Sequence, residues 1–273
     1  MKYLALSFIF IVFSVSGFAQ APDISKLQGL GETKYHEVKY EPLDQTYHIF
    51  VRLPEEYTAS KKYPTVYLLD GGAMFPMLGS YYRYLNFGEE APEMIVVGVS
   101  YGSNDWGGQN QRSRDFTAPA KSSEAYGGAA KFSAFFKTTL FPLIEKEYAS
   151  DSDKRIVFGQ SLGGQYSLYA AQVETGLFWG HIASNPALHR NLKFFLNAIP
   201  KKDKNVRLFV SSGSNDNPRF LVPAKKWVAH WKDKNDVDWG LKTEILDGQT
   251  HMSAAPEAFR RGIKWIFELA DKD

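Results

Sequence analysis

The chain has 273 residues, contains no cysteine and carries a formal net charge of only +2. This length suffices for one sizeable hydrophobic core and is short for two. The missing cysteines exclude disulfides, thiol ligands and thiol redox chemistry, and the near-neutral charge gives no support for nucleic-acid binding.

Residues 1–19 have the pattern of a secretory signal peptide. Lys2 gives a basic start, residues 3–15 form an apolar run, and small residues precede the expected cleavage point after Ala19. The run is short for a membrane-spanning helix, so a retained anchor is the less favoured alternative. We therefore predict an exported, periplasmic protein whose mature chain, residues 20–273, forms one domain with no integral membrane span.

Beyond the signal peptide, strand-like and helix-like patterns alternate. Residues 34–53 alternate apolar and polar side chains, which predicts an antiparallel hairpin at a sheet edge. Short apolar runs follow at 65–69, 94–99, 155–158 and 206–212, separated by longer amphipathic segments such as 131–148, in which Pro142 predicts a kink or a turn. This order predicts an α/β fold with a mostly parallel central sheet and helices on both faces.

The loop after the 65–69 strand contains a glycine pair, Gly71-Gly72. Glycines let the backbone turn an N–H group inward, and an inward N–H group can stabilise an oxyanion. Gly72 is the favoured donor and Ala73 the alternative. An ordinary connection between a strand and a helix would also accommodate two glycines.

A long segment, residues 101–126, follows the 94–99 strand. Loops of this length in compact domains are usually functional or disordered, and this one leaves the edge of the sheet where α/β proteins bind ligands. Trp106 is a candidate for stacking on a substrate ring or acyl group, and Arg112 for binding a carboxylate. Arg114 and Asp115 are better interpreted as a structural ion pair that holds the loop.

The most informative motif is Gly159-Gln160-Ser161-Leu162-Gly163, which lies between the 155–158 strand and a predicted helix at 164–171. Strand, G-x-S-x-G and helix together are typical of a nucleophile elbow, which exposes a serine hydroxyl on a strained turn. Ser161 is therefore the candidate nucleophile. The N–H group of Leu162, the residue after the nucleophile, is the second candidate oxyanion donor.

A serine hydroxyl needs a base, and in the α/β-hydrolase fold the base is a histidine near the end of the chain. His251 follows a short strand and a polar loop that contains Gly248, and it precedes an amphipathic helix beginning at Pro256. It is the candidate general base. His189, after the turn at Asn185-Pro186, is a weaker candidate for lining the substrate pocket.

The acid of such a triad should follow the 206–212 strand. Asp216 has that position, and it lies between Ser161 and His251 in chain order. A turn or helix-capping role is the alternative for an aspartate before Pro218. Asp247 is closer to His251 in sequence but lies on the wrong side of the loop.

These motifs resemble the esterase-D-like branch of the α/β hydrolases, and most of all a group of predicted periplasmic hydrolases that includes siderophore esterases. The matching residues are 63–71, 114–117, 127–129 with Phe132, 159–164 and 248–251. The resemblance implies a serine hydrolase acting on esters, with Ser161 and His251 in the nucleophile and base positions. Family members vary in the acid, and some siderophore esterases rely mainly on a Ser-His pair. The resemblance therefore supports Asp216 less strongly than it supports Ser161 and His251.

The sequence thus predicts a carboxylic ester hydrolase with a small-molecule ester substrate. Neither a metal nor a cofactor is expected, because the chain has no H-E-x-x-H, His-x-His or G-x-G-x-x-G pattern. Two alternatives remain: acyl transfer by the same triad, and a non-catalytic binding protein on a hydrolase scaffold. Substrate choice among siderophore lactones, carbohydrate acetyl or feruloyl esters and short-chain esters stays open, as does the oligomeric state.

Overall fold

The computed structural model describes residues 26–105, 108–121, 123–200, 206–232, 234, 237 and 239–270. The expected signal peptide, residues 1–19, and Trp106 lie outside the described residues. Over the part that is described, no helix combines the length and hydrophobicity needed to cross a membrane.

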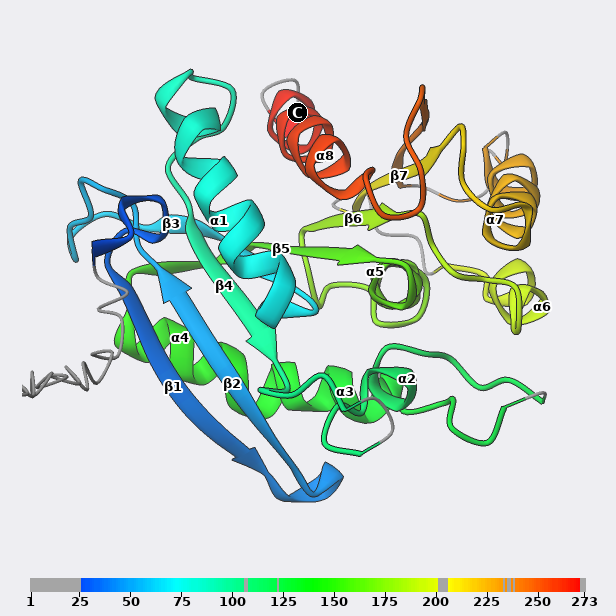
Figure 1. Cartoon of the computed structure of the whole chain (residues 1–273), viewed down its shortest axis with the longest axis horizontal. Coiled ribbons are helices and arrows are strands. Elements are labelled where there is room, and N and C mark those ends of the chain that lie inside the picture. The colour runs from blue at the N-terminus through cyan, green and yellow to red at the C-terminus, as the bar shows by residue number, and fades with distance from the viewer. Residues whose placement is uncertain are drawn as a thin grey trace, which may run out of the picture.

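Eight strands form one mixed sheet (Figure 1). They are β1 (Thr33–Tyr40), β2 (Gln45–Arg52), β3 (Tyr63–Leu68), β4 (Ile95–Ser100), β5 (Ser150–Gln160), β6 (Gly180–Ser184), β7 (Arg207–Gly213) and β8 (Gly240–Leu246), in the spatial order β1-β2-β4-β3-β5-β6-β7-β8. β1 and β2 pair antiparallel, β2 joins β4 antiparallel, and every later pairing is parallel. The predicted N-terminal edge hairpin and the mostly parallel sheet are confirmed.

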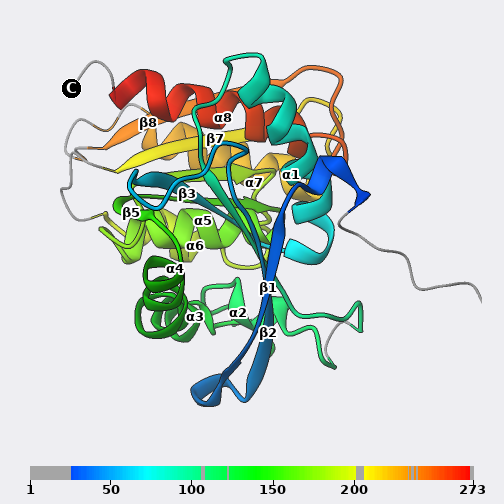
Figure 2. The same cartoon turned by 90° about the vertical axis from the view of Figure 1, so that its left-hand side faces the viewer.

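Helices cover both faces of the sheet (Figure 2). They are α1 (Gly71–Phe87), α2 (Arg112–Asp115), α3 (Ala129–Phe135), α4 (Phe141–Glu147), α5 (Leu162–Val173), α6 (Leu192–Asn197), α7 (Pro218–Trp231) and α8 (Ala255–Ala270), with short helical turns at Gln28–Leu30 and Glu41–Leu43. Side chains alternate between the faces because a strand has a period of two. Leu68 and Phe158 therefore pack with α1 and α8, whereas Tyr67 and Val157 pack with α3 to α7.

The helix predicted at 131–148 is built from three contiguous segments: α3, a π-helical turn at Phe136–Leu140, and α4. Pro142 lies in the first turn of α4 and can neither donate a backbone hydrogen bond nor tolerate a regular helix before it. The wider turn ends two residues before the proline and separates its ring from the preceding carbonyls. The proline thus changes the helical geometry locally, and the helix continues.

The segment 101–126 is anchored as the sequence predicts. Arg114 Nε lies 2.6 Å from Asp115 Oδ1, and the Asp115 carboxylate is fully buried. Its other oxygen accepts hydrogen bonds from the hydroxyls of Tyr47 (2.7 Å) and Tyr101 (2.9 Å). This network fastens α2 to β2 and to the end of β4, next to the edge of the sheet where the candidate residues gather.

Candidate active site

Ser161 occupies a strained turn between β5 and α5. Its φ is 61° and its ψ is −113°, a backbone conformation that a residue with a side chain rarely adopts. A Cβ on Gly159 would lie 2.1 Å from the carbonyl carbon and oxygen of Gly163, so only glycine lets the helix start so close to the strand. The Ser161 N–H group donates to Ser184 O at 3.0 Å, which ties the turn to the end of β6.

The structure brings Ser161, His251 and Asp216 together. His251 Nε2 lies 2.9 Å from Ser161 Oγ, and His251 Nδ1 lies 3.0 Å from both carboxylate oxygens of Asp216. The Asp216 side chain is 1% exposed and the His251 side chain 17% exposed. A buried carboxylate on Nδ1 favours the tautomer whose Nε2 accepts the serine proton. Asp247, the poorer candidate on sequence grounds, instead accepts a hydrogen bond from Ser214 Oγ at 3.4 Å.

The two candidate oxyanion donors lie in the first turns of two neighbouring helices. Gly72 is the second residue of α1 and Leu162 is the first of α5, where N–H groups have no partner within the helix. The Ala73 N–H group donates to Asp70 O at 2.9 Å, so this alternative donor is already engaged. A Cβ on Gly163 would lie 3.8 Å from Asp70 Oδ2, which shows that the two helix starts adjoin.

Arg112 does bind a carboxylate, but the carboxylate belongs to the protein. Its Nε and one terminal nitrogen lie 2.7 Å from the two oxygens of Asp70, and its side chain is only 9% exposed. Asp70, with φ 53°, is the residue that turns β3 into α1. Arg112 therefore supports the turn that presents Gly72, a contact that its position in the sequence did not reveal.

His189 and the triad residue His251 both contact the ring of Phe220. The ring of Phe220 stacks on the His251 imidazole, with centroids 4.3 Å apart and an interplanar angle of 27°. The His189 ring meets Phe220 edge-on at 5.2 Å, and His189 Nε2 lies 2.8 Å from a terminal nitrogen of Arg219. Since a guanidinium only donates, His189 Nε2 accepts and the ring is neutral.

The pKa of His189 falls from its ordinary value of 6.5 to about 4, first because of burial and then because of the nearby charges of Arg219 and Arg190. Protonating this ring therefore costs more in the folded protein than in the unfolded chain. The resulting stability is complete above pH 6.5 and is lost as the pH falls toward 4.

We predict that thermal unfolding scans will show this loss and that His189→Gln will remove it. The Tm of the wild type should fall relative to that of the variant between pH 6.5 and 4, and the difference should be constant above pH 7. A difference between the two proteins that does not change across that window would contradict the assignment.

Two polar residues near the triad were not singled out from the sequence. Asn185 and Gln160 both donate a side-chain hydrogen bond to the backbone carbonyl of His251. Gln160 stands inside the G-x-S-x-G motif and Asn185 immediately follows β6. Phe220 was also missed, because nothing in a helical pattern tells which neighbour an aromatic ring will stack on.

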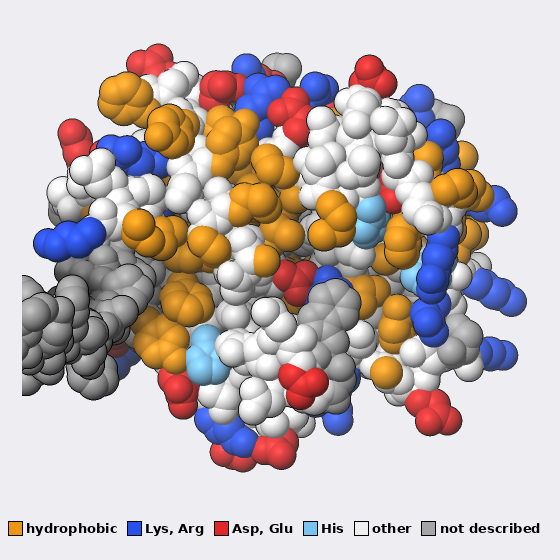
Figure 3. All heavy atoms as spheres, in the orientation of Figure 1, with side chains coloured by type: hydrophobic (Ala, Val, Ile, Leu, Met, Phe, Trp, Pro, Cys, Tyr) orange, Lys and Arg blue, Asp and Glu red, His pale blue; other side chains and the backbone are white. Residues whose placement is uncertain are grey.

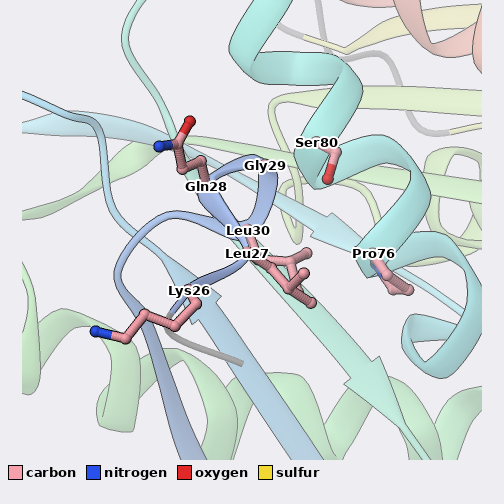
Figure 4. A pocket seen from close by; sticks show the side chains of 7 residues that line it. All are labelled: Lys26, Leu27, Gln28, Gly29, Leu30, Pro76 and Ser80. Atoms are coloured by element: carbon pink, nitrogen blue, oxygen red, sulfur yellow. The ribbon is translucent and has the colours of Figure 1, made fainter. Parts of the chain in front are cut away.

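The described residues contain no group of three or more His, Asp or Glu side chains placed to hold a metal ion. A hollow of about 490 Å³ lies between residues 26–30 and α1, where Pro76 and Ser80 face it (Figure 4). None of the triad residues lines it, and neither candidate oxyanion donor does.

The model of the family described as "Putative esterase" matches residues 41–251. This chain belongs to that family. Ferri-bacillibactin esterase BesA of Bacillus subtilis (strain 168) is 26% identical over 254 residues, which cover 81% of this chain and 85% of BesA. The apo-salmochelin esterase of Escherichia coli O6:H1 is 25% identical over 215 residues, or 72% of this chain and 66% of the relative.

A solved structure has the same fold. The IroE-like serine hydrolase from Shewanella oneidensis superposes with a TM-score of 0.77 at 23% identity, covering 87% of this chain and 80% of that one. Together with the family model, this confirms the predicted α/β-hydrolase fold. Membership of the family makes the chain an ester hydrolase.

Proposed function

We propose that this esterase is a serine hydrolase in which Ser161 is the nucleophile, His251 the general base and Asp216 the residue that orients the base. One observation carries the proposal: Ser161 Oγ, the two ring nitrogens of His251 and the Asp216 carboxylate form a continuous chain of contacts between 2.9 and 3.0 Å. Such a chain activates a hydroxyl that is otherwise a poor nucleophile.

In the proposed reaction, Ser161 Oγ attacks the ester carbonyl while its proton moves to His251 Nε2. The N–H groups of Gly72 and Leu162 stabilise the oxygen of the tetrahedral intermediate. When the ester bond breaks, the imidazolium returns the proton to the leaving alcohol and an acyl-serine remains. A water molecule, deprotonated by His251, then attacks the acyl-serine and releases the acid and the free Ser161 hydroxyl.

The substrate we propose is a siderophore ester. The two curated relatives are named for esters of this class. Lys and Arg side chains crowd the right-hand edge of the face in Figure 3, which is the edge occupied by α6 and α7 in Figure 1. Arg190 and Arg219 lie close enough to His189 for their charges to act on its ring. A basic rim of this kind favours an acidic substrate.

An experiment can separate the three activities considered for the chain. Purified protein would be treated with a fluorophosphonate and assayed on a siderophore lactone, a feruloyl carbohydrate ester and a p-nitrophenyl acyl ester, with and without an added alcohol. Phosphonylation at Ser161 and hydrolysis fastest on the lactone would support the proposal. Preferential transfer to the alcohol would indicate an acyltransferase, and neither reaction would indicate a binding protein.

We further propose that the enzyme is exported and that its mature chain begins at Gln20. The support is the basic, apolar and small-residue succession in residues 1–19. Protein recovered from a secretory host should have an intact mass that begins at Gln20, or at the pyroglutamate formed from it. Recovery of a chain that still carries residues 1–19 in the membrane fraction would contradict export by cleavage.

A further inference from the structure

Asn185 lies at the centre of the candidate site in an unusual conformation. It directly follows β6, its φ is 43°, and the next residue is Pro186. A residue before proline favours an extended backbone, and a positive φ is costly for any residue other than glycine. Asparagine tolerates this region better than most side chains do. Asn185 is only 1% exposed, so the surrounding protein keeps it in this strained conformation.

The side-chain amide of Asn185 makes three hydrogen bonds. Its Nδ2 donates to Thr250 O at 3.1 Å and to His251 O at 3.2 Å, and its Oδ1 accepts from the Gly213 N–H group at 2.8 Å. Only one orientation of the amide fits, because the oxygen must face the N–H group and the nitrogen must face the two carbonyls. One side chain therefore joins the loop that carries Asp216 to the loop that carries His251.

The same strand end also holds the nucleophile. Ser184, the last residue of β6, accepts the backbone hydrogen bond of Ser161 at 3.0 Å, and the Asn185 N–H group donates to Ser211 O at 2.8 Å. The two loops already touch, because Asn215 N donates to Gln249 O at 2.9 Å. Asn185 adds a connection from a third strand. The end of β6 is therefore hydrogen-bonded to the turn of Ser161, to the loop of Asp216 and to the loop of His251.

From this geometry we infer that Asn185 is a positioning residue for the triad: its amide fixes the His251 backbone relative to Asp216 and Ser161. The hydrogen bonds of its amide go to backbone atoms of Gly213, Thr250 and His251, and not to the reacting atoms. The inference rests on the proposed roles of the three triad residues. His251 Nε2 lies 2.9 Å from Ser161 Oγ. Proton transfer depends on this distance, so even a small displacement of the imidazole would slow it.

Two substitutions test the inference. Asn185→Asp keeps the shape but places a carboxylate oxygen against the two carbonyls, and Asn185→Ala removes the amide. Each should lower kcat by on the order of 10²-fold and leave KM within about threefold, because the substrate contacts are unchanged.

Gln172 offers a matched control. It is 2% exposed, its Nε2 donates to Phe195 O (3.0 Å) and Ala198 O (2.9 Å), and its Oε1 accepts from Trp227 Nε1 (3.2 Å). This amide also joins two backbone carbonyls to one N–H donor, but it does so at the far end of α5. Gln172→Ala and Gln172→Glu should lower the Tm as the Asn185 variants do, while kcat stays within about threefold of the wild type.

A spectroscopic readout makes the test independent of catalysis. The proton shared between His251 Nδ1 and Asp216 should give a low-field proton resonance in the wild type and in the Gln172 variants, and the resonance should be lost or broadened in both Asn185 variants. An unchanged resonance in folded Asn185→Asp would overturn the inference, as would a kcat loss no larger than that of the Gln172 variants. If the proposed function were wrong, the wild type would neither hydrolyse esters nor react with a fluorophosphonate. In that case the resonance alone would show whether Asn185 positions His251 relative to Asp216.

Discussion

Ser161→Ala is expected to lower kcat for ester hydrolysis by at least about 10⁴-fold while the protein stays folded. The hydroxyl is the group aligned at 2.9 Å on His251 Nε2, and without it no acyl-enzyme can form. The oxyanion donors and the substrate contacts would remain, so a small residual rate is expected. Alanine has a Cβ like serine, and the turn at φ 61° should therefore be no more strained than before.

Ser167→Ala is the matched control for this variant. Ser167 is buried within α5, six residues after Ser161, and its hydroxyl donates to Gly163 O at 3.3 Å within the helix. Steady-state kinetics on the best ester of the panel should show Ser167→Ala near the wild type, and circular dichroism should show both variants folded. Near-normal hydrolysis by folded Ser161→Ala would refute the assignment of the nucleophile.

Asp216→Asn is expected to lower kcat by about 10⁴-fold and to change KM little. The amide keeps the shape of the carboxylate but turns an N–H group toward His251 Nδ1, which forces the imidazole into the wrong tautomer. It also removes the charge that stabilises the imidazolium in the transition state. Because both losses arise in the transition state, they should appear in kcat.

Asp247→Asn provides the comparison for the acid. Asp247 lies four residues before His251, and its carboxylate contacts Ser214 Oγ instead of the imidazole, so this variant should keep kcat within a few-fold. Measuring both variants beside His251→Ala distinguishes a triad from a pair. If Asp216→Asn keeps most of its activity while His251→Ala loses it, the enzyme works as a Ser-His pair and Asp216 only shapes its loop.

Local patterns in the sequence were enough to predict the architecture. Alternating polar and apolar residues mark an edge hairpin, and near-continuous apolar runs mark strands that are buried on both faces. The glycines around Ser161 predicted the tight turn between β5 and α5, where a Cβ on Gly159 would meet Gly163. The place of Asp216 directly after the 206–212 strand then favoured it over Asp247. Each of these inferences depends on neighbours a few residues apart or on the order of elements in the fold.

The sequence by itself determined the fold class, the family and the three residues proposed for catalysis. Only the tertiary structure decided that Arg112 binds Asp70, that Phe220 stacks on His251 and that Asn185 joins the loops of Asp216 and His251. The physical reason is the parallel sheet, whose strand ends gather loops from distant parts of the chain at one edge. Which side chains meet there depends on loop conformation and rotamer, and neither leaves a periodic signal in the sequence.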